Sequence, residues 1–333
     1  MRIIIYGAGA VGSVIGGRLS QAGTDVVLVA RPAHADAINR DGLLLRTGVH
    51  DQRVRVHSIT DLTELSPTED DVVVITAKTQ DTPAIHDAIA RWDRNTIVVC
   101  ATNGVEHERI ALRLFPHVYA MVVQMPATFE KPGEVTALCM PTNAVLDVGR
   151  YPSGSDDVAR ALAATLDAAP HLSSVADANV MTKKYEKVLI NVGNTADALC
   201  GPVGRNSAVV VASQAEGRAV FAAAGIEMSA DDVDDPYRAR LATMRFSIPT
   251  GATFIGGSTW QSLAKGATSV ETDYFNGEIA LLGRLHHIAT PANTFLQNLA
   301  HHLVRRGAAP GTFTCDELDA LWRANRFEHP LPT

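Results

Sequence analysis

Lys187, Asn191 and Asn194 recur at positions i, i+4 and i+7 within the mostly apolar stretch 181–200. On a helix that turns about 100° per residue, this spacing places the three side chains on one face. Apolar residues fill most of the remaining circumference, which is typical of a buried helix. A partly desolvated lysine can stabilise negative charge on a ligand and supply a proton, while carboxamides offer uncharged hydrogen bonds. In the alternative interpretation, the lysine reaches water and the asparagines cap buried backbone.

A second candidate site is the segment GAGAVG, which follows the apolar run RIIIY and precedes a helical pattern that ends at Gly23. It fits the dinucleotide-binding pattern G-x-G-x-x-G. The first glycine makes a tight turn, the second lets the backbone approach a pyrophosphate, and the third allows close helix packing. We expect the phosphates to bind at the helix N-terminus, held by a loop of six residues: Gly7, Ala8, Gly9, Ala10, Val11 and Gly12. A glycine-rich turn without a ligand is the alternative.

The end of the second apolar run, DVVLVAR, carries Arg31. NAD-selective folds usually have an acidic residue at this point, which binds the ribose 2′-hydroxyl. A guanidinium would instead pair with a 2′-phosphate through charge-assisted hydrogen bonds. Arg31 therefore favours NADP(H), unless it is simply a solvated surface residue.

A helix start is predicted at Thr268–Glu271, because the segment T-S-V-E fits a capping box. In that interpretation, Glu271 bonds the backbone of its own helix and has no chemical role. Asp273 would add favourable charge in the same turn. Thr290 and Pro291 are expected to start the next helix, with proline at its first position.

The composition is that of an ordinary globular protein of about two domains: 333 residues, 46% hydrophobic and 20% charged. The net charge is −7 and the basic residues are scattered, which argues against nucleic acid or an anionic membrane as a partner. The four cysteines show no metal-binding spacing, so we expect no metal and free buried thiols. The N-terminal residues run directly into the first strand, so no targeting peptide and a cytoplasmic location are expected.

Residues 1–177 are predicted to form an α/β dinucleotide-binding domain with a parallel sheet. Apolar runs such as RIIIYG, DVVLVA, DDVVVITAK and NTIVVCA alternate with helical patterns, as buried parallel strands do. GLLLRTG and QRVRVHS indicate an inserted hairpin or edge pair, and FEKPGEV indicates a turn between antiparallel strands. Residues 178–333 are predicted to form a helical domain, with helices over 179–200, 206–224, 236–246, 258–265, 271–287 and 291–305.

These features, together with Thr102–Gly104, Lys184–Asn191 and Val270–Asn293, resemble the ketopantoate reductase (2-dehydropantoate 2-reductase) family. The resemblance covers nearly the whole chain. Its most specific block is a glutamate, then D-Y-x-N-G, a helix, and I-x-T-P-x-N. It implies a Rossmann-like domain, a helical domain, a cleft between them, and reduction of a 2-oxo acid to a 2-hydroxy acid by NADPH.

The resemblance also implies roles for individual residues. The glycine loop and Arg31 would bind the cofactor, as would Lys78, which follows a strand, and Asn103, which would lie beside the nicotinamide. Lys187 corresponds to the catalytic lysine, Asn191 to a substrate-binding asparagine, and Glu271 to a glutamate that faces the substrate.

Two departures from the family pattern concern substrate binding. The family usually has a second asparagine eight residues after the lysine, where this chain has Thr195, with Asn194 one place earlier. The family also often has Ser-Ser-Met where this chain has Ser258–Thr259–Trp260, which keeps a hydroxyl for the substrate carboxylate. On a straight helix Asn194 would point along the face of Lys187 more directly than Thr195.

The expected function is therefore reduction of 2-dehydropantoate to pantoate, a step of pantothenate and coenzyme A biosynthesis. Reduction of another 2-oxo acid or a bulky ketone by a paralogue is the first alternative, and a non-catalytic NADP(H) sensor is the second. The sequence does not decide whether the protein forms a homodimer.

Overall fold

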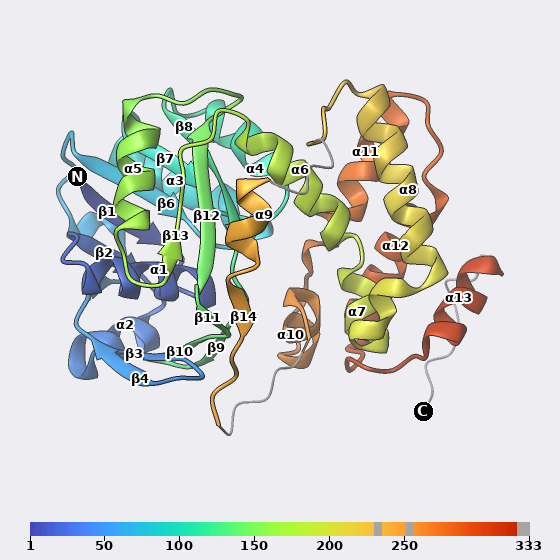
Figure 1. Cartoon of the computed structure of the whole chain (residues 1–333), viewed down its shortest axis with the longest axis horizontal. Helices are drawn as coiled ribbons and strands as arrows, with labels where there is room; N and C mark the ends of the chain where they lie inside the picture. Colours follow the sequence, from blue (N-terminus) through green and yellow to red (C-terminus); the bar gives the residue numbers. More distant parts are fainter. Residues whose placement is uncertain (230–234, 251–255, 325–333) are drawn as a thin grey trace. The chain divides into compact units, whose positions relative to one another are not determined.

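The computed structural model describes residues 1–229, 235–250 and 256–324, and it divides into two compact units (Figure 1). The first unit comprises Met1–Lys184 and Ala230–Thr253. The second comprises Tyr185–Ser229 and Phe254–Thr333. The chain first passes from one unit to the other within helix α6 (Val180–Asn191).

An eight-stranded sheet forms the centre of the first unit, in the order β13-β12-β8-β7-β6-β1-β2-β5. Its strands are β1 (Arg2–Tyr6), β2 (Val26–Val29), β5 (His57–Ile59), β6 (Asp71–Ile75), β7 (Ile97–Cys100), β8 (Val118–Gln124), β12 (Ala144–Arg150) and β13 (Leu172–Ser173). The strands from β8 to β5 are parallel, which confirms the predicted parallel sheet. The sheet is mixed, however, because β12 runs antiparallel to β8.

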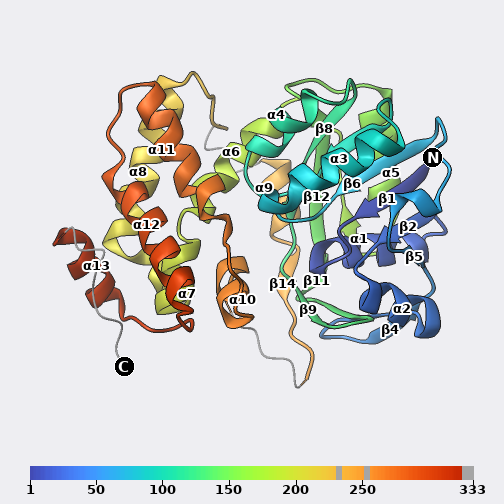
Figure 2. The same ribbon diagram turned by 180° about the vertical axis from the view of Figure 1, so that it is seen from behind.

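Helices cover both faces of this sheet, as buried parallel strands require. One face packs against α1 (Ala10–Gln21) and α5 (Asp157–Asp167), and the other against α3 (Thr82–Trp92) and α4 (Glu106–Leu112) (Figures 1 and 2). The helix α2 (Pro32–Asp41) follows β2. Two short 3₁₀ helices, η1 (Leu62–Glu64) and η2 (Thr79–Asp81), complete the connections.

A smaller four-stranded sheet, β4-β3-β10-β9, belongs to the same unit. The predicted hairpin is confirmed, since β3 (Leu43–Arg46) pairs antiparallel with β4 (Asp51–Val54). The predicted antiparallel turn is also confirmed, since β9 (Ala127–Lys131) pairs with β10 (Glu134–Ala137) and Gly133 between them has φ +81°.

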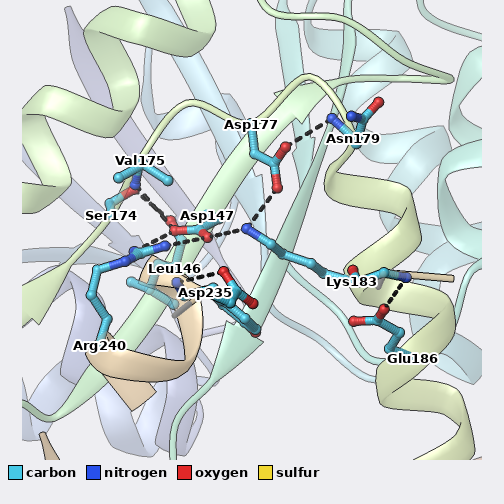
Figure 3. A network of polar contacts seen from close by, with 12 residues as sticks. Leu146, Asp147, Ser174, Val175, Asp177, Asn179, Lys183, Glu186, Asp235 and Arg240 are labelled. Carbon is cyan, nitrogen blue, oxygen red and sulfur yellow. Dashed lines mark hydrogen bonds and ion pairs between the residues drawn. The ribbon is translucent and has the colours of Figure 1, made fainter. Parts of the chain in front are cut away.

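The segment 236–246 differs from the predicted helix and belongs to the first unit. It forms a short helix, α9 (Pro236–Leu241), and a strand, β14 (Met244–Phe246), that pairs with β11 (Cys139–Pro141). The fully buried Asp147 of β12 accounts for this placement (Figure 3). Its carboxylate accepts hydrogen bonds from Arg240 at 2.6 and 2.7 Å and from Lys183 at 2.8 Å. Such a buried carboxylate needs these cations, and they hold the segment on the sheet.

The second unit is helical, as predicted. Its elements are the end of α6, α7 (Asn194–Cys200), η3 (Pro202–Asn206), α8 (Ala208–Ala223), α10 (Ser258–Ala264), η4 (Glu271–Tyr274), α11 (Asn276–Leu285), α12 (Pro291–Arg306) and α13 (Cys315–Arg323). The apolar core of this unit lies between α7, α8, α12 and α13. Within the described residues, none of the helices has the length and apolar character that crossing a membrane requires.

Candidate active site

The cofactor-side candidates of the first unit follow four neighbouring parallel strands, β7, β6, β1 and β2. Asn103 follows β7, Lys78 follows β6, the glycine loop follows β1, and Arg31 follows β2. The strand register aligns these ends, since Tyr6 lies opposite both Val29 and Ile75. All four candidates therefore meet at one edge of the sheet, where α/β folds bind their ligands.

Glycine is needed at different positions of the loop for different structural reasons. Gly7 has φ +101°, and a Cβ there would lie 2.8 Å from the backbone nitrogen of Ala77. A Cβ on Gly12 would lie 2.4 Å from the side-chain oxygen of Thr76, so this glycine is required for packing. A Cβ on Gly9 would meet only the Gly7 carbonyl, at 3.9 Å. Packing does not explain Gly9, whereas the approach of a ligand to the backbone does.

The start of α1 offers unpaired donors beside this open space. Gly9 is the N-cap, and the first backbone N–H bonded back to the loop is that of Ser13, which donates to the Gly9 carbonyl at 3.0 Å. The N–H groups of Ala10, Val11 and Gly12 precede that bond, so they have no acceptor within the helix. Such a helix start can bind a phosphate group.

The buried histidine His34 holds the glycine loop in place through a chain of hydrogen bonds. The Gly133 N–H donates to His34 Nδ1 at 2.8 Å, so His34 carries its proton on Nε2 and donates to Ser13 Oγ at 3.0 Å. The Ser13 hydroxyl in turn donates to the Ala8 carbonyl at 3.1 Å. Burial lowers the pKa of His34, which favours this neutral form. Sequence reasoning missed this chain of contacts, because it joins residues far apart in the sequence.

The segment that carries Asn103 is fixed in a similar way. The Thr79 hydroxyl donates to the Asn103 carbonyl at 3.3 Å. Thr102 Oγ1 lies 3.0 Å from His107 Nδ1, and His107 Nε2 lies 2.9 Å from His86 Nε2. Burial lowers the pKa of both histidines, that of His86 to about 4, so both are neutral and one ring donates to the other.

Arg31 is exposed at the start of α2, in the position where an NAD-selective fold carries an acid. Lys78 is half-buried at the N-cap of η2, and Asn103 is half-buried in its loop. These three side chains and the glycine loop form the cofactor-side group.

The substrate-side candidates all belong to the second unit: Lys187, Asn191, Asn194, Thr195, Ser258, Thr259 and Glu271. The neighbouring lysines of α6 are structural. Lys183 pairs with Asp147 and Asp177, and Lys184 forms a buried ion pair with Glu108. Lys187, one turn after Lys183, is half-buried. Lys187 is the catalytic candidate of this helix.

The predicted single helix over 179–200 is wrong, because the chain breaks it at Val192 and Gly193, between α6 and α7. Asn276 Nδ2 donates to the Val192 carbonyl at 3.2 Å and so satisfies a group that the break exposes. The helix is also not buried all round, since Ile190 is 55% exposed. The straight-helix argument for Asn194 therefore does not apply.

Asn276 belongs to a buried network built on the glutamate block. It accepts from Thr272 Oγ1 at 3.1 Å and donates to Asn293 Oδ1 at 3.1 Å. Asn293 donates to Glu216 at 2.8 Å, and Glu216 also accepts the N–H groups at the start of α12. The predicted start of α12 at Pro291 is confirmed. The asparagines of D-Y-x-N-G and T-P-x-N thus act as structural residues.

Arg205 of η3 contacts two residues of α7, and one of these, Asp197, contacts the start of α10. It donates from Nη2 to Asn194 Oδ1 at 2.8 Å, and its Nε lies 3.4 Å from Asp197 Oδ1. Asp197 Oδ2 accepts the Gly257 N–H at 2.7 Å, and Gly257 is the N-cap of α10. The first two residues of α10 are Ser258 and Thr259. Sequence reasoning did not identify Arg205 or Asp197.

Three further candidates have informative surroundings. Asn191 is 8% exposed, and its Nδ2 is a buried donor with no acceptor among the described residues. Glu271 is also buried, and it is the first residue of η4. The N-cap of η4 is Val270, whose side chain makes no capping hydrogen bond. The predicted capping box at Thr268 is therefore wrong. Trp260 packs against the apolar cluster around Leu263, so this departure from the family pattern fills the core.

No group of three or more histidine, cysteine or acidic side chains lies close enough to hold a metal ion in the described ranges.

Comparisons with known proteins place the chain in a family. The family model "Ketopantoate reductase PanE/ApbA" matches residues 3–151, and its C-terminal counterpart matches residues 179–304. The 2-dehydropantoate 2-reductase of Halobacterium salinarum is 29% identical over 325 residues, which cover 92% of this chain and all of that protein.

Solved structures agree with this result. A ketopantoate reductase of the PanE/ApbA family from Ralstonia eutropha JMP134 has a TM-score of 0.75 and 29% identity, over 92% of this chain and 99% of that one. A D-mandelate dehydrogenase bound to NADH and anilino(oxo)acetate shares the fold, with a TM-score of 0.72 and 23% identity over 92% of this chain and 99% of its own. The chain belongs to the ketopantoate reductase family of oxidoreductases.

Proposed function

We propose that this protein reduces a 2-oxo acid to a 2-hydroxy acid with NADPH, and that 2-dehydropantoate is its substrate. The observation that carries the proposal is the alignment of Asn103, Lys78, the glycine loop and Arg31 at the ends of four neighbouring strands. The product would be pantoate, a precursor in pantothenate and coenzyme A biosynthesis. A small-molecule 2-oxo acid is thus the proposed partner.

The residues of the first unit fit a phosphorylated dinucleotide. The start of α1 offers N–H donors, and the open space at Gly9 leaves room for a pyrophosphate. Arg31 would bind the 2′-phosphate of NADPH through charge-assisted hydrogen bonds. When bound, the nicotinamide supplies a hydride, and Asn103 would orient its ring.

The residues of the second unit fit the acid. As the carbonyl carbon is reduced, negative charge grows on the carbonyl oxygen, and Lys187 would stabilise that charge and donate the proton. The unpaired Nδ2 of Asn191 supports a substrate contact, since a buried donor without an acceptor is costly unless a ligand supplies one. We assign the substrate carboxylate to the hydroxyls of Ser258 and Thr259, and a substrate-facing role to Glu271.

A second candidate is reduction of another 2-oxo acid or a bulky ketone. The presence of Thr195 where the family usually has a second asparagine supports it, because this position is expected to bind the substrate. Whether Asn194 or Thr195 contacts the substrate decides how a hydroxylated acid would bind. Catalytic turnover with any 2-oxo acid would exclude the third possibility, a non-catalytic NADP(H) sensor.

The cofactor assignment is tested by Arg31→Asp, with Arg40→Asp on the same helix as the matched control. Loss of a charged hydrogen bond should lower kcat/KM for NADPH by about 10- to 100-fold, while NADH is affected much less. The control should leave both unchanged, because Arg40 is exposed and pairs with its neighbour Asp41. Equal kcat/KM of the wild type for the two cofactors would refute the NADPH assignment.

A further inference from the structure

Two cysteines of the helical unit lie together although they are far apart in the sequence. Cys200 is the last residue of α7, and Cys315 is the first residue of α13. Both side chains are half-buried, and Cys315 lies close enough to Cys200 to contribute to the raised pKa of the Cys200 thiol. The prediction that all four cysteines are buried is therefore wrong for this pair, since only Cys100 and Cys139 of the four are buried.

The backbone fixes this pairing independently of the thiols. The Gly311 N–H donates to the Ala198 carbonyl at 2.9 Å, and the Phe313 N–H donates to the Leu199 carbonyl at 3.1 Å. The segment before α13 thus runs alongside the last residues of α7 (Figure 1). Cys315 then lies beside Cys200 as the next step of the same alignment.

Both sides of the pair are held firmly. Phe313 and Cys200 pack against the same apolar cluster. Thr314 and Glu317 form a capping box that sets the first turn of α13, with the Thr314 N–H donating to Glu317 at 2.8 Å. The backbone pairing and the capped start of α13 therefore hold the two cysteines next to each other as a dithiol.

The surroundings distinguish the two thiols. Burial raises the pKa of Cys200 to about 12, with a further contribution from Cys315. Cys200 therefore stays a thiol at neutral pH, which makes it the weaker nucleophile towards an oxidant. Cys200 lies inside the family match and Cys315 outside it, since that match ends at residue 304.

We propose that Cys200 and Cys315 form a reversible disulfide when the protein meets a hydroperoxide. Cys315 sulfur attacks the peroxide, is oxidised to the sulfenic acid, and releases water or an alcohol. Cys200 sulfur then attacks the sulfenic sulfur, its proton leaves with the hydroxyl as water, and the S–S bond forms. A dithiol reductant reverses the reaction by thiol exchange and returns both thiols.

The bond would tie α13 to the end of α7 and close a loop of more than a hundred residues. A crosslink over so long a loop restricts the unfolded chain strongly, so the oxidised protein should be more stable than the reduced one. The proposal concerns a modification and does not depend on which acid the protein reduces.

The test uses the reduced full-length chain, which is treated with hydrogen peroxide, denatured and alkylated with N-ethylmaleimide. Intact mass should show that two of the four cysteines have escaped alkylation, and peptide mapping should find the Cys200–Cys315 link. Dithiothreitol should restore four alkylated cysteines. Oxidation should also raise the melting temperature by several degrees.

Two variants give the controls. Cys315→Ser should abolish both the link and the shift in melting temperature, and Cys139→Ala should keep both. Alkylation of all four cysteines after oxidation would overturn the proposal. A link between two chains on a non-reducing gel would also overturn it, as would irreversible oxidation of Cys315 with Cys200 still alkylated.

Discussion

In the first unit, the candidate residues follow directly after strands, and the hydrogen-bonded ladder sets their positions. Neighbouring strands of fixed register align Asn103, Lys78, the glycine loop and Arg31. In the second unit, the candidates lie on separate helical segments, which long-range side chains connect. Asp197 links α7 to the start of α10, Arg205 of η3 holds both Asn194 and Asp197, and Asn276 satisfies the carbonyl at the break between α6 and α7.

This difference determines how each half should respond to mutation. Where backbone register positions a group, most side-chain changes should be tolerated, and glycines that allow close packing should be sensitive. Where side chains position a group, mutating one such side chain should also displace the candidate residues that it holds in place. The predictions below test that contrast.

The largest effect is expected for Lys187→Ala. Loss of the proton donor and of the charge beside the carbonyl oxygen should lower kcat by roughly 10²- to 10⁴-fold. The affinity for NADPH should change little, because the proposed cofactor residues belong to the other unit. Stopped-flow kinetics of NADPH oxidation would measure kcat, and fluorescence titration would measure binding.

Lys187→Arg separates the two roles of the lysine. Arginine keeps the positive charge but does not give up its proton in proteins. We expect kcat to remain far below that of the wild type. Recovery of most of the rate in Lys187→Arg would mean that only the positive charge is needed. Nearly full kcat in Lys187→Ala would show that Lys187 has a structural role and no catalytic one.

A smaller effect is expected for Arg205→Gln. The change removes a charged hydrogen bond to Asn194 and the ion pair with Asp197, so the KM for the 2-oxo acid should rise by about 10- to 100-fold. The Kd for NADPH should stay the same. Arg218→Gln, an exposed arginine of α8, is the matched control and should be silent. Equal changes in the binding of acid and cofactor would contradict a positioning role on the substrate side.

The smallest effects should come from a pair of glycine variants. Gly12→Ala forces a methyl group to within 2.4 Å of the Thr76 hydroxyl, so it should destabilise the protein by about 1–3 kcal/mol. Gly9→Ala has open space and should leave the melting temperature unchanged, yet weaken NADPH binding because the methyl group enters the ligand's space. If Gly9→Ala bound NADPH normally, this loop would not approach a pyrophosphate.

The fold of the first unit was largely predictable, because its buried strands are continuous apolar runs that end in recognisable turns. The strand β14 was missed, since three residues carry little pattern and its pairing depends on the contact of Arg240 with Asp147. The helix α13 was also missed, although its Thr314–Glu317 capping box was readable.

The site was predictable in part. The glycine loop and the residues after strands follow from local pattern, and the structure aligns them. Arg205, Asp197 and His34 could not be identified, because their importance lies in partners distant in the sequence. The false capping box at Thr268 shows the same limit, because the motif alone does not fix a helix start, and the N-cap lies two residues later, at Val270.

The central claim is tested most directly by the initial rate of NADPH oxidation with a panel of 2-oxo acids, including 2-dehydropantoate. We predict steady turnover, the highest kcat/KM with 2-dehydropantoate, and loss of that turnover in Lys187→Ala. A higher kcat/KM with another 2-oxo acid would change the substrate but keep the reaction. Absence of NADPH oxidation with every acid in the panel, by a protein that binds NADPH, would contradict the proposed reductase activity.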